Sequence, residues 1–507
     1  MKKLMIKDFL WTTVILITLF FLSITAFGTE IKEATDLTDT MLIFLPDGTN
    51  PEYMTDNDIN TYVSLPGSSV VTVSHPEGIS GIYIEWNKIP GSWSYSIDGV
   101  YLTAGTDGYL HEYVSFSKTA LTVTITIPDS GAQITDIYCF SQGTLPDWVQ
   151  VWDPPCEQAD LMLLSTHSDD EQLFYAGVLP YYAGELETAV QVVYMTNHWD
   201  TAGRPHEQLN GLWTVGVRNY PVIGPFPDDA ASLGSTKESV DTVLQRALNV
   251  YDEELLTAFQ VEMIRRFRPQ VIIGHDIAGE YRHGAHIVNT YTLMKALEIS
   301  NDKSHYPDSA EIYGVWDVPK TYLHLYEENP IVMDWDIPLK SFGDITAFEV
   351  SKLGYACHIS QQWTWFTRWI SKAKASEITS YNPCFYGLYR STVGVDVNKN
   401  DFLENITTYH KQAEIEKAEQ AALAEAERVA SEKAAEAAAA SAEAEHLAAA
   451  NAMKAAAEAE KGASDSEPPQ TGTHIVTLCL AIFVTLMVIT AIVLLLRRKK
   501  RKERTKS

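Results

Sequence analysis

Basic side chains are scarce in this sequence relative to acidic ones. Lys and Arg number 38 against 66 Asp and Glu, which gives the 507-residue chain a formal net charge of -28. Eight of the basic residues fall in the C-terminal segment "RRKKRKERTKS", so the rest of the chain is more acidic still. Nucleic acids and other polyanions bind to basic surfaces. We therefore expect no nucleic-acid partner, and a neutral ligand fits this composition better.

Cysteine is also scarce, and none of the five cysteines has the spacing of a zinc finger. Cys479 lies in an apolar segment near the C-terminus. The other four are an even number, as in proteins of oxidising compartments. The shortest closures join Cys139 to Cys156 and Cys357 to Cys384, but the sequence leaves the pairing open. We expect structural or free thiols rather than a catalytic cysteine.

Long apolar runs at the two ends predict targeting segments. A lysine-containing start, an apolar run from Phe9 to Leu22 and small residues up to Gly28 predict a signal peptide over residues 1–28, with an uncleaved anchor as the alternative. Residues 475–496 are long enough to cross a hydrocarbon core of about 30 Å. The basic tail behind them favours a cytoplasmic C-terminus. The region between the two runs is then extracellular.

The segment before the second apolar run reads "EPPQTGTH". "PPQTG" (468–472), the span and the basic tail to residue 507 together resemble a Gram-positive sortase sorting signal. Pro468 stands where such signals usually have leucine. The resemblance implies sortase as a partner and anchoring to the cell wall or plasma membrane of a Gram-positive-type bacterium. A juxtamembrane turn before an ordinary membrane anchor is the alternative.

The length predicts two or three folded units. Residues 29–145 alternate short β-rich runs with turns, which is typical of an all-β antiparallel sandwich. Within them "MTDNDINTYVSL" resembles the opening of galactose-binding-like, discoidin-type jelly rolls. The resemblance implies a sugar-binding module and a structural Ca²⁺ held in part by Asp56 and Asp58. A turn rich in Asp and Asn without an ion is the alternative.

After the joint "TLPDWVQVWDPPCEQ" the pattern changes. In residues 156–400 buried strands alternate with helices, which predicts an α/β, Rossmann-like domain with a parallel sheet covered on both faces. Ligands of such domains bind beyond the C-terminal ends of the strands.

In residues 405–462 the composition reduces to Ala, Glu and Lys. This composition predicts a semi-rigid helical stalk of about 80–90 Å.

Polar residues follow two of the predicted buried strands. "ADLMLLSTHSDDEQLFYAG" places His167, Asp169 and Asp170 at a strand end, where uncompensated charges cost several kcal/mol. After "QVIIG", His283 and His286 open a helix on one face. Together, His167, Asp170 and His286 give the open three-ligand set of a catalytic zinc. For the acids alone, the alternative is a charge cluster at a helix N-terminus.

The same residues carry a family resemblance. "THSDDE" and "GEYRHGAH" resemble the two signature motifs of PIG-L/LmbE-type zinc N-deacetylases. "KLGYACHISQQ", with His358, Ser360 and Gln361, resembles the terminal element of that family. The sequence departs from the motifs by Thr166 for alanine, Ser168 for proline and Arg282 for glycine. None of these departures removes a ligand, and Arg282 bears on substrate access only.

The resemblance implies roles for individual residues. His167, Asp170 and His286 would hold zinc, and Asp169 would be the general base that takes a proton from the attacking water. A protonated His283 would stabilise the oxyanion or protonate the leaving amine. Tyr281 would polarise the amide carbonyl.

Further polar and aromatic residues also have predicted places. Arg204 and Glu207 in "GRPHEQ" match an Arg-x-x-Glu element that binds substrate, with a surface ion pair as the alternative. His275 and Asp276 fit a supporting role, such as orienting the ligand histidine. His198 and His206 fit exposed loops. The tryptophans at 335, 363, 365 and 369 fit core packing more often than stacking on a sugar.

These observations predict a secreted, surface-anchored zinc N-deacetylase, a hydrolase of carbon–nitrogen bonds other than peptide bonds. The expected substrate is an N-acetylated amino sugar, GlcNAc or GalNAc, in a glycan or glycoconjugate. One alternative is the same chemistry on another N-acyl conjugate. The other is a catalytically inactive, glycan-binding surface adhesin, against which the complete ligand set and Asp169 count.

Overall fold

The computed structural model describes residues 32–462 of the chain. The predicted signal peptide (1–28), the "PPQTG" motif (468–472) and the apolar segment 475–496 lie outside the described residues. Within the described part, no helix has both the length and the apolar character that crossing a membrane requires. The chain divides into two compact units after Ile415, and the first unit holds both large sheets.

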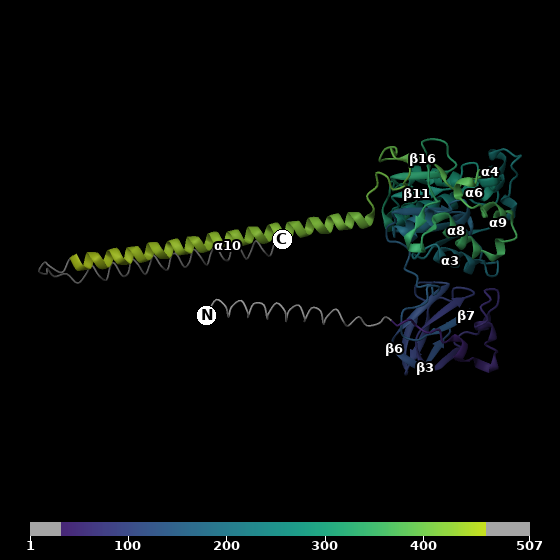
Figure 1. The fold of residues 1–507 in the computed structure, drawn as a ribbon, viewed down its shortest axis with the longest axis horizontal. Helices are drawn as coiled ribbons and strands as arrows, with labels where there is room; N and C mark the ends of the chain where they lie inside the picture. Colours follow the sequence, from purple (N-terminus) through teal and green to yellow (C-terminus); the bar gives the residue numbers. More distant parts are fainter. Residues whose placement is uncertain (1–31, 463–507) are drawn as a thin grey trace, which may run out of the picture. The chain divides into compact units, whose positions relative to one another are not determined.

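An antiparallel sheet of seven strands forms the N-terminal region (Figure 1). The strands lie in the order β2-β7-β3-β6-β4-β5, with β1 paired to β3. The prediction of a β-rich region is confirmed, and its jelly-roll topology stays a prediction. The strands are β1 Leu42–Phe44, β2 Val63–Leu65, β3 Val70–Trp86, β4 Trp93–Ile97, β5 Val100–Ala104, β6 His111–Thr126 and β7 Ala132–Phe140.

Strand β4 shows why these segments form a sheet with one buried face. Its sequence "WSYSI" buries Trp93, Tyr95 and Ile97, while the two serines between them are only half-buried. Because side chains of a strand alternate between the two faces of a sheet, this pattern places the large residues in the core.

The turn predicted to hold Ca²⁺ lies between β1 and β2. There Asp56 accepts hydrogen bonds from Thr61, at 2.9 and 3.0 Å, and Asp58 accepts one from the Asn60 amide at 3.0 Å. These bonds satisfy the turn internally, and the calcium site stays a prediction.

A mixed sheet of seven strands forms the second region, in the order β10-β9-β8-β11-β12-β16-β13. The pairings from β10 to β12 are parallel, as the sequence predicts. The prediction is wrong at one edge, where β16 is antiparallel to β12 and β13 because the chain re-enters the sheet from its opposite end. The strands are β8 Leu161–Ser165, β9 Val190–Asn197, β10 Val222–Pro227, β11 Val271–Gly274, β12 Lys320–His324, β13 Pro330–Val332 and β16 Phe385–Ser391.

Helices cover both faces of this sheet, as alternate residues of β8 show. Leu161 and Leu163 belong to the apolar cluster that includes residues of α3 and α8. Met162 and Leu164 belong to a second cluster that includes residues of α5 and α6. The five residues of β8 are therefore all buried, and apolar and polar residues do not alternate along the strand. The helices, most of them labelled in Figure 1, are α2 Asp170–Leu173, α3 Arg204–Thr214, α4 Val240–Leu248, α5 Glu253–Phe267, α6 Gly284–Ile299, α7 Pro307–Tyr313, α8 Ala347–Ala356 and α9 Trp365–Ile370.

Two small elements complete this region. Strands β14 (Pro338–Leu339) and β15 (Ile345–Thr346) form a hairpin before α8. The helix expected after β8 is interrupted: α2 ends at Leu173, and a π-helical turn follows over Pro180–Glu185. Pro180 has no amide hydrogen to donate, so a regular helix does not continue through it.

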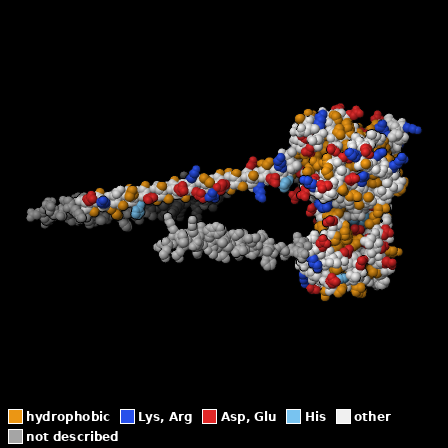
Figure 2. All heavy atoms as spheres, viewed as in Figure 1, with side chains coloured by type: hydrophobic (Ala, Val, Ile, Leu, Met, Phe, Trp, Pro, Cys, Tyr) orange, Lys and Arg blue, Asp and Glu red, His pale blue; other side chains and the backbone are white. Residues whose placement is uncertain are grey.

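The predicted long helix is confirmed as α10, Tyr409–Gly462. It contains 54 residues, which at about 1.5 Å per residue gives a rod of about 81 Å. Nearly all of its described side chains are exposed. On the face in view, Lys, Arg, Asp and Glu are spread along its length (Figure 2). An exposed helix rich in Ala and Glu depends on intrinsic helix propensity rather than on a core of its own.

The four cysteines of the described region are unpaired. Cys139, Cys156 and Cys384 are buried, and Cys357 is half-buried. Burial raises the pKa of the Cys139, Cys156 and Cys384 thiols, to about 12 for the last two, so these thiols stay protonated and unreactive. The sequence leaves open whether these cysteines form disulfides or stay as free thiols, and in the described residues they are free thiols.

A buried ion pair attaches the segment before α10 to β12. Lys320 Nζ lies 2.6 Å from Asp396 Oδ1 and donates to the Glu404 carbonyl at 2.8 Å. The side chains are 0% and 4% exposed, and the Tyr322 hydroxyl also donates to Asp396. Removing one member leaves the other charge buried without compensation.

We predict that Asp396→Ala lowers the free energy of unfolding by about 3–5 kcal/mol. Lys118 and Asp98 provide the matched control, since they pair at the same 2.6 Å but are 55% and 69% exposed. Asp98→Ala should cost less than about 1 kcal/mol. Denaturant unfolding of the two variants measures both values, and equal losses would contradict the assignment.

Candidate metal centre and active site

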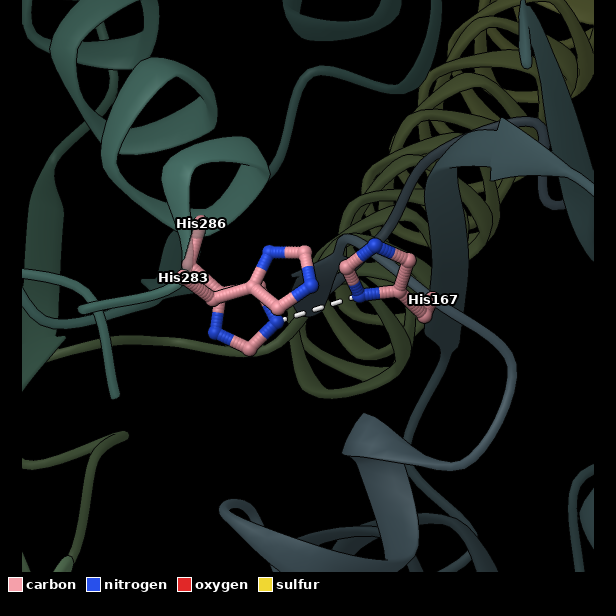
Figure 3. A group of neighbouring side chains, drawn as sticks. All are labelled: His167, His283 and His286. Atoms are coloured by element: carbon pink, nitrogen blue, oxygen red, sulfur yellow. Dashed lines mark hydrogen bonds between the residues drawn. The ribbon is translucent and has the colours of Figure 1, made fainter. Parts of the chain in front are cut away.

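Three ligand atoms form a nearly equilateral triangle at the C-terminal edge of the mixed sheet. His167 Nδ1 lies 3.2 Å from Asp170 Oδ2 and 3.1 Å from His286 Nε2, and the last two atoms are 3.2 Å apart. Figure 3 shows the two imidazoles facing each other from different elements. Zinc bonds to N and O ligands are about 2.0–2.1 Å long, which places the ligands of a tetrahedral site about 3.3 Å apart. The triangle therefore fits zinc.

The topology explains why these residues meet. His167 follows β8, Asp170 opens α2, and His286 lies in the first turn of α6, which follows β11. Strands β8 and β11 are hydrogen-bonded neighbours and parallel. Their C-terminal ends thus lie at one edge, and the residues behind them converge there. The structure brings together the three ligands that the sequence predicts.

Asp170 carries the negative charge of this triangle. Its Oδ2 also accepts the His167 amide at 2.8 Å, and its side chain is 3% exposed. Burial alone would raise the pKa of this carboxyl, but His286 and His167 outweigh burial, so the pKa lies well below its usual value. The group is therefore an anion, the form that binds a metal.

Asp169, the predicted general base, lies beside the triangle in a strained backbone conformation. Its φ of 120° is one that residues with a Cβ rarely adopt, and such strain is concentrated at functional sites. Burial raises the pKa of its carboxyl to about 7, Asp170 adds to the increase, and Arg204 opposes it. Arg204 Nη2 lies 3.8 Å from Asp169 Oδ2.

Glu280 orients the ligand histidine, a role that the sequence reasoning missed. Its Oε2 accepts from Nδ1 of His286 at 2.7 Å and of His275 at 2.8 Å, and its Oε1 accepts from His324 Nδ1 at 2.6 Å. A proton on Nδ1 of His286 leaves its Nε2 free for a metal. Glu280 is fully buried, and its neighbouring imidazoles hold its pKa well below the usual value although burial opposes them. Its place beside Tyr281 in "GEYRHGAH" is the signal that could have identified it.

The supporting role predicted for His275 and Asp276 needs correction in part. His275 is held by Glu280, and its Nε2 accepts the Thr166 amide at 3.1 Å, so it supports the β8 loop. Asp276 Oδ1 accepts the Ala278 amide at 3.1 Å, within its own loop. The His275 ring also stacks on His286 at 4.1 Å between ring centres, so its supporting role is borne out, and only the role of Asp276 needs correction.

Asp228 is a second residue that the sequence did not reveal. It follows β10, and its carboxylate oxygens lie 3.4 Å from His167 Nε2 and 3.7 Å from His198 Nδ1. His198 is buried rather than exposed as predicted, because its Nε2 accepts the Ser168 amide at 3.2 Å. A single acid after an edge strand has no local motif that marks it.

His283 and Tyr281 line the same edge of the site. The His283 ring meets the His167 ring edge to face at 4.5 Å and stacks on His286 at 4.6 Å (Figure 3). Burial and these two neighbours lower the pKa of His283 well below its usual value, so the ring is neutral here, in contrast to the protonated form that the resemblance implies. Its Nδ1 has no hydrogen-bond partner among the described residues. Tyr281, at φ 46°, contacts His283 at 5.4 Å and the half-exposed Trp365 at 5.7 Å between ring centres.

Arg204 and Glu207 lie on α3 and are both buried. Arg204 Nη2 donates to the Ser168 carbonyl at 2.7 Å, while its Nε has no partner among the described residues. Glu207 accepts from the Ser360 amide at 2.7 Å and hydroxyl at 2.6 Å, which binds the "HISQQ" segment to α3. The alternative of a surface ion pair is therefore wrong, since the two residues face different partners.

The remaining candidates are distributed between core and surface. His358 is fully buried and lies 3.3 Å from Glu171 Oε1. Trp335 is 1% exposed and packs in the core, whereas Trp363 is 84% exposed. Trp369 packs against the core and donates to the Ser380 carbonyl at 2.9 Å. Core packing thus holds for some of the tryptophans, as expected.

Part of the chain is similar to known deacetylases. No family model matches the chain. The chain is similar to 1D-myo-inositol 2-acetamido-2-deoxy-alpha-D-glucopyranoside deacetylase 2 of Saccharopolyspora erythraea, with 28% identity over 181 residues, 32% of this chain and 63% of the relative. It is also similar to deacetylase 1 of that name from Catenulispora acidiphila, with 26% identity over 220 residues, 38% of this chain and 64% of the relative. The chain thus spans less than two thirds of these relatives.

Among solved structures, N,N'-diacetylchitobiose deacetylase from Pyrococcus horikoshii aligns with 14% identity and a TM-score of 0.33, over 46% of this chain and 85% of its own. The curated relatives are deacetylases by name, which confirms the resemblance to deacetylases that the motifs indicate.

We predict that Glu280→Gln weakens zinc binding by about 10- to 100-fold, because the carboxylate that orients His286 is lost. Competition against a chelating dye measures the dissociation constant. Asp276→Asn in the same loop is the control and should bind zinc as the parent chain does. Equal affinity in all three proteins would contradict the orienting role of Glu280.

Proposed function

We propose that this protein is a zinc-dependent N-deacetylase that removes the acetyl group from an N-acetylated amino sugar, GlcNAc or GalNAc, in a glycan or glycoconjugate. The observation that carries the proposal is the triangle of His167, Asp170 and His286, together with Asp169, the residue before Asp170, whose carboxyl pKa Asp170 helps to raise. Similarity to amino-sugar deacetylases supports the choice of substrate.

Zinc bound by His167, Asp170 and His286 would polarise the amide carbonyl and make a nearby water more acidic. Asp169 is the base that accepts the proton of the attacking water. Its pKa of about 7 suits this task at neutral pH, and the Arg204 guanidinium keeps part of its charge compensated. Hydrolysis then converts the amide and one water into a free amine and acetate.

His283 and Tyr281 complete the acid side of the reaction. The proton that Asp169 takes from the water has to end on the leaving nitrogen. His283, neutral before the reaction, would accept that proton from Asp169 and donate it to the nitrogen as the carbon–nitrogen bond breaks. The Tyr281 hydroxyl is protonated, because burial raises its pKa well above the usual value. It therefore acts as a hydrogen-bond donor to the carbonyl oxygen as negative charge develops there.

We also propose that the protein works outside the cell, attached by sortase or by a membrane span. This part rests on the sequence of residues 1–28 and 468–507. It fits an enzyme whose substrate is a surface glycan, on the cell's own wall or on a host.

The first test concerns metal and base separately. The purified chain should bind one zinc and release acetate from an N-acetylated glycan panel. Asp169→Asn should keep zinc while losing about 10²–10⁴-fold in turnover, the usual contribution of a general base. His286→Ala and Asp170→Asn should lose zinc. Near-parental turnover of Asp169→Asn would require another base, and zinc binding unchanged in His286→Ala would exclude this centre.

A second test concerns attachment. Deleting Pro468–Gly472 should move a wall-linked pool, released only by muralytic digestion, into the membrane fraction. Recovery of the unaltered protein in detergent extracts, full length and with its basic tail, would show that the membrane itself is the anchor.

A further inference from the structure

Helix α3 lies between the site and the N-terminal region of the chain. One of its faces carries Arg204 and Glu207, which bond Ser168 and Ser360 of the catalytic region. The other face carries His206, Asn210 and Trp213, which lie three or four residues apart and therefore on one side of the helix. The hydrogen bonds of these three side chains run to His111, Gln150 and Asp147, in the N-terminal part of the described chain.

A buried pair of histidines forms the centre of this second face. His111 of β6 and His206 of α3 are 0% and 1% exposed, and His111 Nε2 lies 2.7 Å from His206 Nδ1. Gln150 bridges the same elements, with its Oε1 2.9 Å from His111 Nδ1 and its Nε2 donating to Asn210 Oδ1 at 2.6 Å. Trp213 Nε1 donates to the Asp147 carbonyl at 2.7 Å.

The hydrogen bonds fix the tautomers of both rings. Gln150 Oε1 also accepts from Trp152 Nε1 at 3.0 Å, so it is an acceptor, and His111 Nδ1 must carry the proton. His111 Nε2 is then the acceptor for the Nδ1–H of His206. Both rings are neutral, in agreement with the lowering of their pKa values by burial, to about 3 for His111.

A second contact fixes the first residue of the helix. Gly203, the N-cap of α3, has φ 75°, and a Cβ there would lie 2.7 Å from Asn60 Oδ1 and 3.3 Å from the Ile59 side chain. The turn before β2 is therefore closely packed against the backbone one residue before Arg204. Any displacement of this turn or of the histidine pair moves the start of α3.

We infer that the N-terminal antiparallel region is a structural part of the catalytic site, and that His206 is a positioning residue. Through the bond from His206 to His111, α3 is fixed so that the Arg204 guanidinium lies against the Ser168 carbonyl and 3.8 Å from Asp169. This inference rests on the proposed deacetylase function. It differs from the role of a separate sugar-binding module, whose loss would affect only polymeric substrates.

A bound metal ion is the alternative explanation for this cluster of side chains. Glu85, His111 and His206 offer ligand atoms within 4.8 Å of one another. However, the two ring nitrogens are 2.7 Å apart, a hydrogen-bond distance that is shorter than the separation of about 3.3 Å between ligands of one zinc. If each chain bound a second zinc that is lost in His206→Ala, the assignment of a hydrogen-bonded histidine pair would be wrong.

The test compares two replacements of His206 in the full chain. His206→Asn keeps a donor near the position of Nδ1, and His206→Ala removes it. With a small soluble N-acetylglucosamine glycoside, His206→Ala should lose about 10- to 100-fold in kcat with KM and the catalytic zinc little changed, as misplaced catalytic groups do. His206→Asn should recover most of this loss. Equal kcat in both variants and the parent chain would overturn the inference.

A double-mutant cycle tests whether His206 acts through Arg204. The kcat loss of His206→Ala should largely disappear in the background Arg204→Ala, whereas independent effects would add. Tyr109→Ala is the control, because Tyr109 stacks on Tyr220, a residue outside α3, at 4.4 Å between ring centres. It should lower the melting temperature and leave kcat unchanged. Additive losses for the first pair would overturn the inference.

A readout without activity separates this inference from the proposed function. Absence of acetate release by the parent chain on every substrate would refute the deacetylase proposal alone. Hydrogen exchange then decides the positioning: amides of residues 203–214 should exchange faster in His206→Ala than in Tyr109→Ala. Equal exchange in the two variants would show that the histidine pair does not fix α3.

Discussion

Two buried carboxylates, Asp170 and Glu280, determine how the site is built. A lone carboxylate without partners at such depth would be protonated. Here imidazoles surround both groups and hold both pKa values below their usual range against the effect of burial. His286 lies between them, 3.2 Å from Asp170 and 2.7 Å from Glu280. The acid pair therefore sets the tautomer of the ring and leaves its Nε2 directed at the triangle.

Backbone strain is concentrated around the same groups. Asp169 and Tyr281 have φ values of 120° and 46°, and Arg282 follows at 65°. Such conformations cost about 1–3 kcal/mol each and persist only where the surrounding packing determines them. Phe174 is part of the packing that holds them in place, since its ring lies 5.7 Å from the His286 ring and 6.0 Å from the Tyr281 ring. Packing thus helps to hold these residues in conformations that the backbone alone would not favour.

The ligand triangle could be predicted from the sequence because strand ends of a parallel sheet converge. "LMLLS" and "VIIG" are continuous buried strands, and the polar residues behind each must meet at one edge. Glu280 could have been found in its motif, but the bonds that it makes to His324 cross 44 residues of chain. Asp228 depends on how β10 lies beside β9, and no local pattern records that arrangement. The antiparallel entry of β16 was missed for the same reason.

The misplacement of His206 has a different physical cause. His206 is predicted to lie in an exposed loop, because polar residues outside an apolar stripe are usually solvated. Helix α3 is instead buried on both faces, with Arg204, His206, Glu207 and Gln208 all at most 8% exposed. Its polar residues are compensated by partners from two regions of the chain, and neither set of partners is local. A helix with buried polar residues on opposite faces therefore marks a joint between two structural regions, and its position constrains both of them. In this protein such a helix links the antiparallel sheet to the edge that carries His167, Asp170 and His286, so the architecture is one continuous unit from β1 to the mixed sheet.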